Sequence, residues 1–221
     1  MKHSFKKLWG SAGVTALLFV LGAGSVRAQA FPEFTVKKGS VTANDEPRSG
    51  AVLCAGNDCF EMPTETLNGM KYEFGLEPKG TRIPFGSGSV VLFSAGFNAG
   101  GPGWLDRLAL LRDDGGGLVN LLPFVPVSRQ GEFATCTVDG VSEMPVVVTA
   151  NPAWKMDAGE TRWDDHVYEV TAFRYDKASD KYVQAMRYVT GKKYASGDAT
   201  PVQVLGPERD EIVRRLRVGT K

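Results

Sequence analysis

Three cysteines are the residues whose chemistry depends most on their surroundings. Cys54 and Cys59 stand close together in "VLCAGNDCF", and Cys136 lies far along the chain. Two nearby thiols in an oxidising compartment are expected to be joined, and the intervening "AGND" consists of turn formers. We therefore predict a Cys54–Cys59 disulfide that closes a turn between two short strands, "AVLC" and "CFEM". On the loop-entropy model, such a small ring stabilises the folded state by about 2 kcal/mol, because it restricts the unfolded chain.

The same cysteines have alternative roles. With Cys136 and His166 they match the ligand count of a Cys3His zinc site, but the spacing lacks a second close ligand pair. A redox motif has two intervening residues beside a βαβ unit, and neither feature is present. Cys136 is expected to be a small buried hydrophobe, and its pairing with Cys54 or Cys59 stays open. We predict no metal site and no cofactor.

His166 is the only histidine after the first thirty residues. Asp164 and Asp165 precede it, but neighbouring residues of a strand point to opposite faces and do not build a Ser-His-Asp triad. No GxSxG elbow occurs either. We therefore predict no catalytic residue and no enzyme. A glycan-acting hydrolase is the third function considered, after the two binding functions given below. Its two catalytic carboxylates need no sequence motif, only a suitable distance in the fold. Glu160 with Asp164, or Asp164 with Asp165, could form such a pair.

The tryptophans favour binding instead. "GFNAGGPGWLD" places one of them after a Gly- and Pro-rich loop, and "NPAWKMDAGETRWDDH" places two among carboxylates. Aromatic rings beside carboxylates on a β scaffold suit contact with sugar rings or with a protein partner, although tryptophans at strand ends also fill cores. The candidate binding residues are Trp104, Trp154, Trp163, Asp164, Asp165 and His166.

Residues 1–30 have the order of a secretory signal peptide: a basic leader, a short apolar run and a small-x-small site at Ala28 and Ala30. The leader holds four basic residues and no acidic one, so its removal changes the formal net charge from +1 to −3. A mildly acidic chain without a basic block has no electrostatic footprint for nucleic acid. No later segment reaches the roughly 20 apolar residues of a membrane span.

These features together predict an exported, non-catalytic protein of the periplasm or extracellular space, of the binding or inhibitor type. Its partner is expected to be a protein or a glycan of the cell envelope, and nucleic acid is excluded. A carbohydrate-binding module that uses exposed tryptophans is the alternative function.

The residues above must be positioned by strands. We predict a mainly β fold of antiparallel strands and hairpins, either partial-propeller-like or a curled sheet or sandwich, with a short C-terminal α-helix. After an irregular segment 31–50, which holds one edge strand in "EFTVK", a single β-rich domain occupies 51–221. Further strands are predicted in "KYEFGLE", "SVVLFSAGF" and "MPVVVTA". The helix is predicted in "GPERDEIVRRLRV", with Pro207 first and a narrow apolar stripe of Ile212, Val213 and Leu216.

Two hairpins share one design. "LALLRDDGGGLVNLLPFV" and "VTAFRYDKASDKYVQAMRYV" both run strand, Asp-led turn, strand, with Asp113 and Asp176 in equivalent places. From Trp104 to Tyr194 the chain thereby resembles FG-GAP/VCBS-type propeller blades of exported bacterial proteins. The resemblance implies a partial propeller or a curled antiparallel sheet, because the chain has room for about two blades and a propeller needs at least four. Neither turn has the alternating Asp residues of a calcium loop, so no calcium is implied.

Overall fold

The computed structural model describes residues 30–40, 49–67, 69–98, 104–128, 130–153, 159–161, 164–195 and 203–219. This part of the chain is mainly β, with antiparallel strands and one short C-terminal helix, as predicted. Residues 1–29 of the predicted signal peptide lie outside it. The strands are β1 (Phe34–Lys37), β2 (Val52–Ala55), β3 (Asp58–Glu61), β4 (Glu65–Leu67), β5 (Met70–Tyr72), β6 (Leu76–Phe85), β7 (Gly88–Asn98), β8 (Trp104–Asp113), β9 (Leu118–Asn120), β10 (Val125–Ser128), β11 (Glu132–Cys136), β12 (Val146–Pro152), β13 (Tyr168–Asp176) and β14 (Lys181–Val189), and the helix is α1 (Arg209–Val218).

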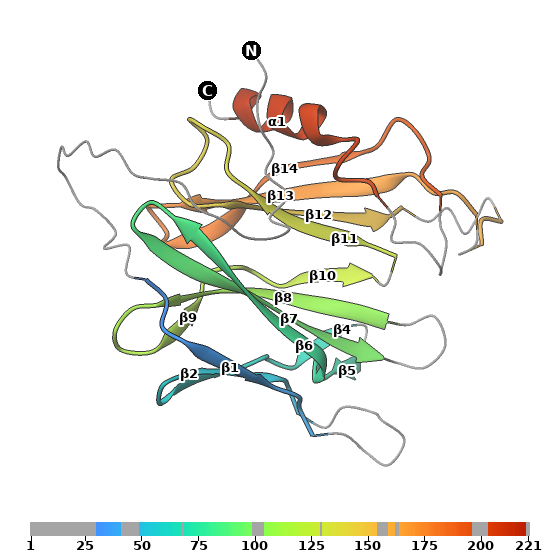
Figure 1. Ribbon diagram of the computed structural model, residues 1–221. Coiled ribbons are helices and arrows are strands. Elements are labelled where there is room, and N and C mark those ends of the chain that lie inside the picture. Colours follow the sequence, from blue (N-terminus) through green and yellow to red (C-terminus); the bar gives the residue numbers. More distant parts are fainter. Residues whose placement is uncertain are drawn as a thin grey trace.

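The elements stack in four layers (Figure 1). A three-stranded sheet, β1-β2-β3, packs on one face of a five-stranded sheet of order β10-β8-β7-β6, in which β9 also pairs with β8. The other face of the five-stranded sheet packs on a four-stranded sheet, β11-β12-β13-β14. Helix α1 covers the outer face of that last sheet. The sheets thus pack face to face, which is the sandwich form of the predicted fold; the FG-GAP/VCBS resemblance stays a prediction.

The position of β7 explains its continuous apolar run. Val91 and Phe93 belong to the core cluster that faces the three-stranded sheet. Val90 and Leu92 belong to the cluster that faces the four-stranded sheet. A strand covered on both faces needs apolar residues at every position rather than at alternate ones. The run "SVVLFSAGF" is therefore mainly apolar because both faces of β7 are buried.

The β2–β3 hairpin confirms the cysteine prediction. Cys54 and Cys59 face each other across the antiparallel pair and form a disulfide, with 4.1 Å between their Cα atoms. Cys136 is free and buried, and burial raises the pKa of its thiol to about 11. Because the disulfide uses both Cys54 and Cys59, the alternative zinc ligand set is wrong.

The segment at residues 31–50 is more ordered than predicted where it is described. The predicted edge strand is β1, at one edge of the three-stranded sheet. Phe31 is almost fully buried, and its backbone N–H donates to the Ser89 hydroxyl at 2.8 Å. Residues 41–48 lie outside the described part. The predicted strand "KYEFGLE" is wrong in its extent, because β5 ends at Tyr72 and β6 begins at Leu76.

The two predicted hairpins differ in regularity. The second is the β13–β14 pair, which keeps one strand on each side and has a register shift between Ala172 and Phe173. In the first, the returning arm breaks into β9 and β10, which both pair with β8. The Asn120 side chain causes the break, because its Oδ1 accepts the backbone N–H groups of Leu110 and Leu122, each at 3.0 Å. Pro123, which has no N–H to donate, follows in the gap between the two strands.

Helix α1 covers the four-stranded sheet, with the predicted apolar stripe against it. It begins at Arg209 rather than at Pro207 and buries Ile212 and Leu216 completely or nearly so. These side chains belong to a core cluster with outward residues of β12 and β13, such as Val148 and Val170. Glu211 in the first turn pairs with Arg215 one turn later, at 2.6 Å, the charge order that suits the helix dipole. No helix in the described ranges has the length and apolar character of a membrane span.

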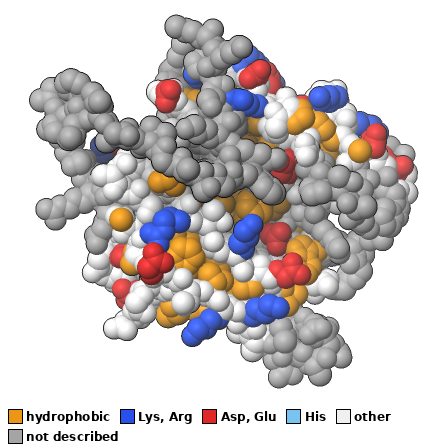
Figure 2. Space-filling view, viewed as in Figure 1, with side chains coloured by type: hydrophobic (Ala, Val, Ile, Leu, Met, Phe, Trp, Pro, Cys, Tyr) orange, Lys and Arg blue, Asp and Glu red, His pale blue; other side chains and the backbone are white. Residues whose placement is uncertain are grey.

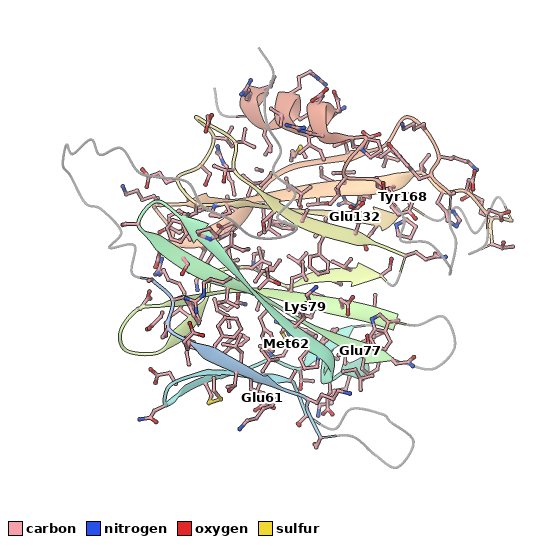
Figure 3. The ribbon with its side chains drawn as sticks, viewed as in Figure 1. Glu61, Met62, Glu77, Lys79, Glu132 and Tyr168 are labelled. Carbon is pink, nitrogen blue, oxygen red and sulfur yellow. A yellow bond between two sulfur atoms is a disulfide. The ribbon has the colours of Figure 1, made fainter. Side chains whose placement is uncertain are left out.

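Glu132 and Tyr168 lie close to the chain segment that precedes α1 (Figure 3). One oxygen of the Glu132 carboxylate accepts the backbone N–H groups of Val204 and Leu205, at 2.8 and 2.9 Å. The Tyr168 hydroxyl is buried and makes no hydrogen bond within the described part of the chain. Burial and the nearby Glu132 charge raise the pKa of Tyr168 to about 12. A buried hydroxyl without a partner costs stability.

A pair of tyrosine variants tests this difference. Tyr168→Phe removes the unsatisfied hydroxyl and is expected to increase the free energy of unfolding by about 1 kcal/mol. Tyr182→Phe is the matched control, because the equally buried Tyr182 hydroxyl donates to the Pro145 carbonyl at 2.6 Å; it is expected to lower stability by about 1 kcal/mol. Urea unfolding followed by circular dichroism measures both. A loss of stability in Tyr168→Phe contradicts the prediction.

Candidate functional site

The apolar core between the five-stranded and four-stranded sheets does not extend to both ends of the sandwich. Val90, Leu92, Leu108 and Leu110 face inward from the five-stranded sheet, and Val147 and Phe173 from the four-stranded one. Further along the same inward rows the side chains become polar. Lys79 pairs with Ser94 and Asp106 with Gly96 on one sheet, and Thr171 pairs with Arg187 on the other.

We call this region the polar end. It is defined by Glu77, Lys79, Ser94, Trp104 and Asp106 of the five-stranded sheet and by Glu169, Thr171 and Arg187 of the four-stranded sheet.

Asn151 shows that both sets of polar residues lie at the same end. Its side chain leaves β12 and reaches β10, where Oδ1 accepts the Ser128 N–H at 2.8 Å and Nδ2 donates to the Pro126 carbonyl at 3.2 Å. Ser128 pairs with Leu105, next to Trp104 at the start of β8. Asn151 itself pairs with Glu169 near the start of β13. The ends of β7, β10 and β12 and the start of β8 accordingly lie on the right-hand side of Figure 1.

Trp104 is the predicted binding residue that the polar end contains. It is half-buried, and its indole Nε1 donates to Oδ1 of Asp106 at 3.0 Å. The ring occupies the space above Gly96, where a Cβ atom would stand 2.8 Å from Trp104 Cε2. Glycine at 96 is thus required by the ring, and the carboxylate sets the ring's orientation. The indole is held in place while part of it stays accessible to solvent.

Asp106 is an unusual residue for an inward sheet position. Burial raises the pKa of its carboxyl group, the Trp104 hydrogen bond lowers it, and the Glu77 charge raises it again. Glu77 has a positive φ of 43°, which is uncommon for a residue other than glycine. It lies at a register shift of β6 between Leu76 and Lys79. Such bulges redirect side chains and are frequent next to functional sites.

The cations of the polar end come from two sheets. Lys79 is exposed on β6, two residues beyond Glu77 (Figure 3). Arg187 of β14 forms an ion pair with Glu169 of β13, and 59% of the Arg187 side chain is exposed. Acidic, basic and apolar side chains lie side by side on the face of the molecule drawn in Figure 2. The polar end therefore combines hydrogen-bond donors from Lys79 and Arg187 with carboxylate acceptors.

The other predicted site residues lie outside the polar end or outside the described residues. Trp154 and Trp163 lie outside the described residues. Asp164 and Asp165 are exposed in the segment before β13, and Asp164 accepts the Thr161 N–H at 2.6 Å and its hydroxyl at 2.9 Å. Those bonds lower the pKa of Asp164.

His166 is fully buried and therefore supports this segment from inside. Its backbone pairs with Tyr194, and its Nδ1 lies 3.6 Å from Oε2 of Glu160. Glu160 in turn accepts a hydrogen bond from Lys193 at 2.9 Å. These contacts anchor the chain just beyond β14 to the segment before β13.

The opposite end of the sandwich is closed. Arg112 of β8 donates to both oxygens of Asp180, at 2.7 and 2.8 Å, and also bonds Asp114. A shallow depression of about 400 Å³ lies nearby, lined by Gly140, Val141, Ser142, Glu143, Tyr175 and Lys177. A Lys177–Glu143 ion pair at 3.9 Å involves two of its lining residues. Among the described residues no group of three or more His, Cys, Asp or Glu side chains could hold a metal ion.

Asp106 was not predicted from the sequence as a site residue, although a signal was present. In "WLDRLALL" the residues 104, 106, 108 and 110 share one face of a strand. A carboxylate in a row that otherwise reads Trp, Leu, Leu marks a departure from the apolar pattern. Glu77, Lys79, Glu169 and Arg187 gave no such signal, because charged residues are ordinary on strands with an open face.

Asp106→Asn tests whether this carboxylate costs stability. The amide keeps an acceptor for Trp104 but removes the charge, so we expect a gain of about 1 kcal/mol at pH 7, or about 2–4 °C in Tm. The pKa of Asp106 is raised in the fold. Its carboxyl group therefore destabilises the folded state increasingly as pH rises from the ordinary pKa to the raised one, and has no such effect below the ordinary pKa. The gain should therefore disappear in acid.

Asp164→Asn is the control for this measurement. Its pKa is lowered by bonds to Thr161, so its substitution is expected to lower the melting temperature at pH 7. Thermal unfolding between pH 3 and pH 7 measures both variants. A destabilised Asp106→Asn at neutral pH would show that the charge is well compensated.

Comparison with known proteins adds little. No protein-family model matches the chain, and no curated protein does. Among solved structures, the crystal structure of CarG matches with 12% sequence identity and a TM-score of 0.38, over 62% of this chain and 92% of that one. A likeness of this size carries no argument about function.

Proposed function

We propose that this chain is an exported, non-catalytic binding protein of the periplasm or extracellular space, and that its partner binds at the polar end. The observation that carries the proposal is the exchange of apolar for polar inward side chains at one end of the sandwich, with Trp104 oriented there by Asp106. Residues that oppose the local rules of packing are expected where function requires them. Tryptophan is also frequent among the residues that dominate binding energy.

Export rests on two features. The first thirty residues have the composition of a signal peptide, and the β2–β3 hairpin carries a disulfide. Disulfides persist in oxidising compartments. Mass spectrometry of the native protein tests this part: a mature chain that begins near residue 31, with Cys54 and Cys59 joined, is expected. An intact Met1 end in a cytoplasmic fraction with both thiols reduced would overturn it.

The non-catalytic part rests on the burial of His166 and on the local hydrogen bonds of Asp106 and Asp164. His166 is buried beside Glu160, whereas Asp106 bonds Trp104 and Asp164 bonds Thr161. General acid–base catalysis needs a donor and an acceptor that converge on one substrate position. The carboxyl groups with a shifted pKa in this region, Asp106 and Asp164, each bond a neighbour within their own segment.

Affinity capture tests the binding function. The tagged mature chain is incubated with envelope extract and culture fluid of the organism that produces it, beside Trp104→Ala and Lys37→Ala variants. Lys37 is the control because it is exposed on β1, on a different sheet. We expect a partner that the wild type and Lys37→Ala retain and Trp104→Ala loses. A retained set that is identical for all three chains would overturn the assignment to the polar end.

A further inference from the structure

We infer that the polar end binds a neutral oligosaccharide, with Trp104 as the stacking surface and with Glu77, Lys79 and Asp106 as hydrogen-bonding groups. This inference rests on the proposed binding function and names its ligand class. It uses residues of the five-stranded sheet, whereas Trp154 and Trp163, the other tryptophans predicted to bind, lie outside the described residues.

The first argument concerns the indole. A sugar ring presents a face of C–H groups, and an aromatic ring that is oriented before binding can cover that face at little entropic cost. Trp104 meets this condition, because Gly96 leaves room beneath it and Asp106 accepts its N–H. An indole that served only as core packing would belong to one of the apolar clusters. The described clusters next to it, around Leu108 and around Phe93, do not include Trp104.

The second argument concerns the polar groups around the ring. One carboxylate oxygen of Asp106 accepts the Trp104 Nε1–H. The carboxylate can accept further hydrogen bonds, including those from a ligand. Glu77 adds a second acceptor near Asp106, and its charge raises the pKa of the Asp106 carboxyl group. Lys79, on the same strand as Glu77, adds hydrogen-bond donors. Sugar hydroxyls both donate and accept, so they need such a mixture. The distance from β6 to β8 is about 10 Å by ordinary strand spacing, which suits a ligand of more than one sugar ring.

The third argument concerns charge. The polar end holds three carboxylates and two cations, and one of these cations, Arg187, already pairs with Glu169. Asp164 and Asp165 add two exposed negative charges in the segment before β13, against the single positive charge of nearby Lys193. An excess of carboxylates repels sulfated, phosphorylated or uronic-acid ligands. A neutral chain of sugars carries no such cost.

Calorimetric titration tests the inference. Cellohexaose, maltohexaose and chitohexaose are titrated separately into the mature chain, with polygalacturonate as the anionic comparison. We expect saturable binding of at least one neutral hexamer and none of polygalacturonate. Trp104→Ala is expected to weaken that binding at least about tenfold. Lys79→Ala is expected to weaken it about threefold or more, and Lys37→Ala is expected to leave it unchanged.

Lys79 and Lys37 are both exposed, so these two variants separate a lost contact from a lost fold even if Trp104→Ala unfolds. Equal binding by wild type, Trp104→Ala and Lys79→Ala would overturn the inference.

The outcomes also separate the ligand class from the function. If no hexamer binds at millimolar concentration while affinity capture still finds a protein partner that requires Trp104, the sugar inference fails and the binding function stands. If capture and titration are both negative, both fail. New reducing ends in the titrated hexamer would confirm the sugar class and overturn the non-catalytic assignment.

Discussion

Replacing Arg107 by alanine is expected to lower the free energy of unfolding by about 3–5 kcal/mol. Arg107 is almost completely buried on β8. Its guanidinium donates to the Pro63 carbonyl at 2.5 Å and pairs with Glu65 at 2.6 Å. The group also lies over the rings of Phe124 and Phe74, at 5.1 and 5.9 Å from their centroids. Alanine would leave a cavity between these rings and remove the partner of Glu65.

The control variants separate charge from volume. A hydrophobic residue of similar size often replaces a buried ion pair without loss. We therefore expect the free energy of unfolding of the double variant Arg107→Met, Glu65→Leu to stay within about 1 kcal/mol of the wild-type value. The double variant should thus be much more stable than Arg107→Ala. Guanidinium unfolding monitored by fluorescence and by circular dichroism measures all three, and coincident transitions confirm two-state behaviour. A loss below about 1 kcal/mol in Arg107→Ala would contradict the buried arrangement.

Replacing Arg112 by alanine is expected to cost about 2 kcal/mol at pH 7. Arg112 joins the turn after β8 to the turn after β13, through Asp114 and Asp180. Tyr175 adds a hydrogen bond to Asp180 at 2.6 Å. Asp180 has a positive φ of 52°, so the contact also holds a backbone conformation that is rare outside glycine. The loss of this link detaches the two hairpin turns from each other.

This contribution should depend on pH in one direction. The Arg112 and Tyr175 hydrogen bonds hold the pKa of Asp180 well below its ordinary value. A carboxylate with a lowered pKa stabilises the fold above the ordinary pKa of about 4, and the stabilisation is lost as pH falls toward the lowered value. The stability difference between wild type and Asp180→Asn should therefore be constant from pH 7 to pH 5 and shrink below pH 4. Asparagine is the suitable substitute because it tolerates positive φ. A difference that grows in acid would contradict the assignment.

Local patterns in the sequence were sufficient for several elements. The continuous apolar run of β7 and the Asp-led turn between β13 and β14 needed no information from elsewhere in the chain. The Cys54–Cys59 disulfide depended on neighbouring residues and an expected compartment. The apolar stripe of α1 likewise predicted the side that docks. Apart from the compartment, which residues 1–30 indicate, each of these features rests on residues within about ten positions of one another, the range over which periodicity and turn preferences act.

Other features depended on contacts between distant residues. The break between β9 and β10 follows from the Asn120 side chain, which takes the place of ladder bonds to Leu110. His166 is buried where its backbone pairs with Tyr194, a residue that follows β14. Arg107 is buried because Glu65 and Pro63 come to it from another hairpin. No local pattern of charges distinguishes such residues from exposed ones.

The sequence by itself determined the class of fold, the disulfide and the helix, because strand alternation, turn chemistry and a helical stripe are local properties of the chain. Only the tertiary structure decided that Trp104, Asp106, Glu77 and Lys79 meet at one end of a sandwich. That meeting depends on the register of β6, β7 and β8 and on how two sheets pack. A shift of one residue in any of these strands would turn the same side chains to the opposite face.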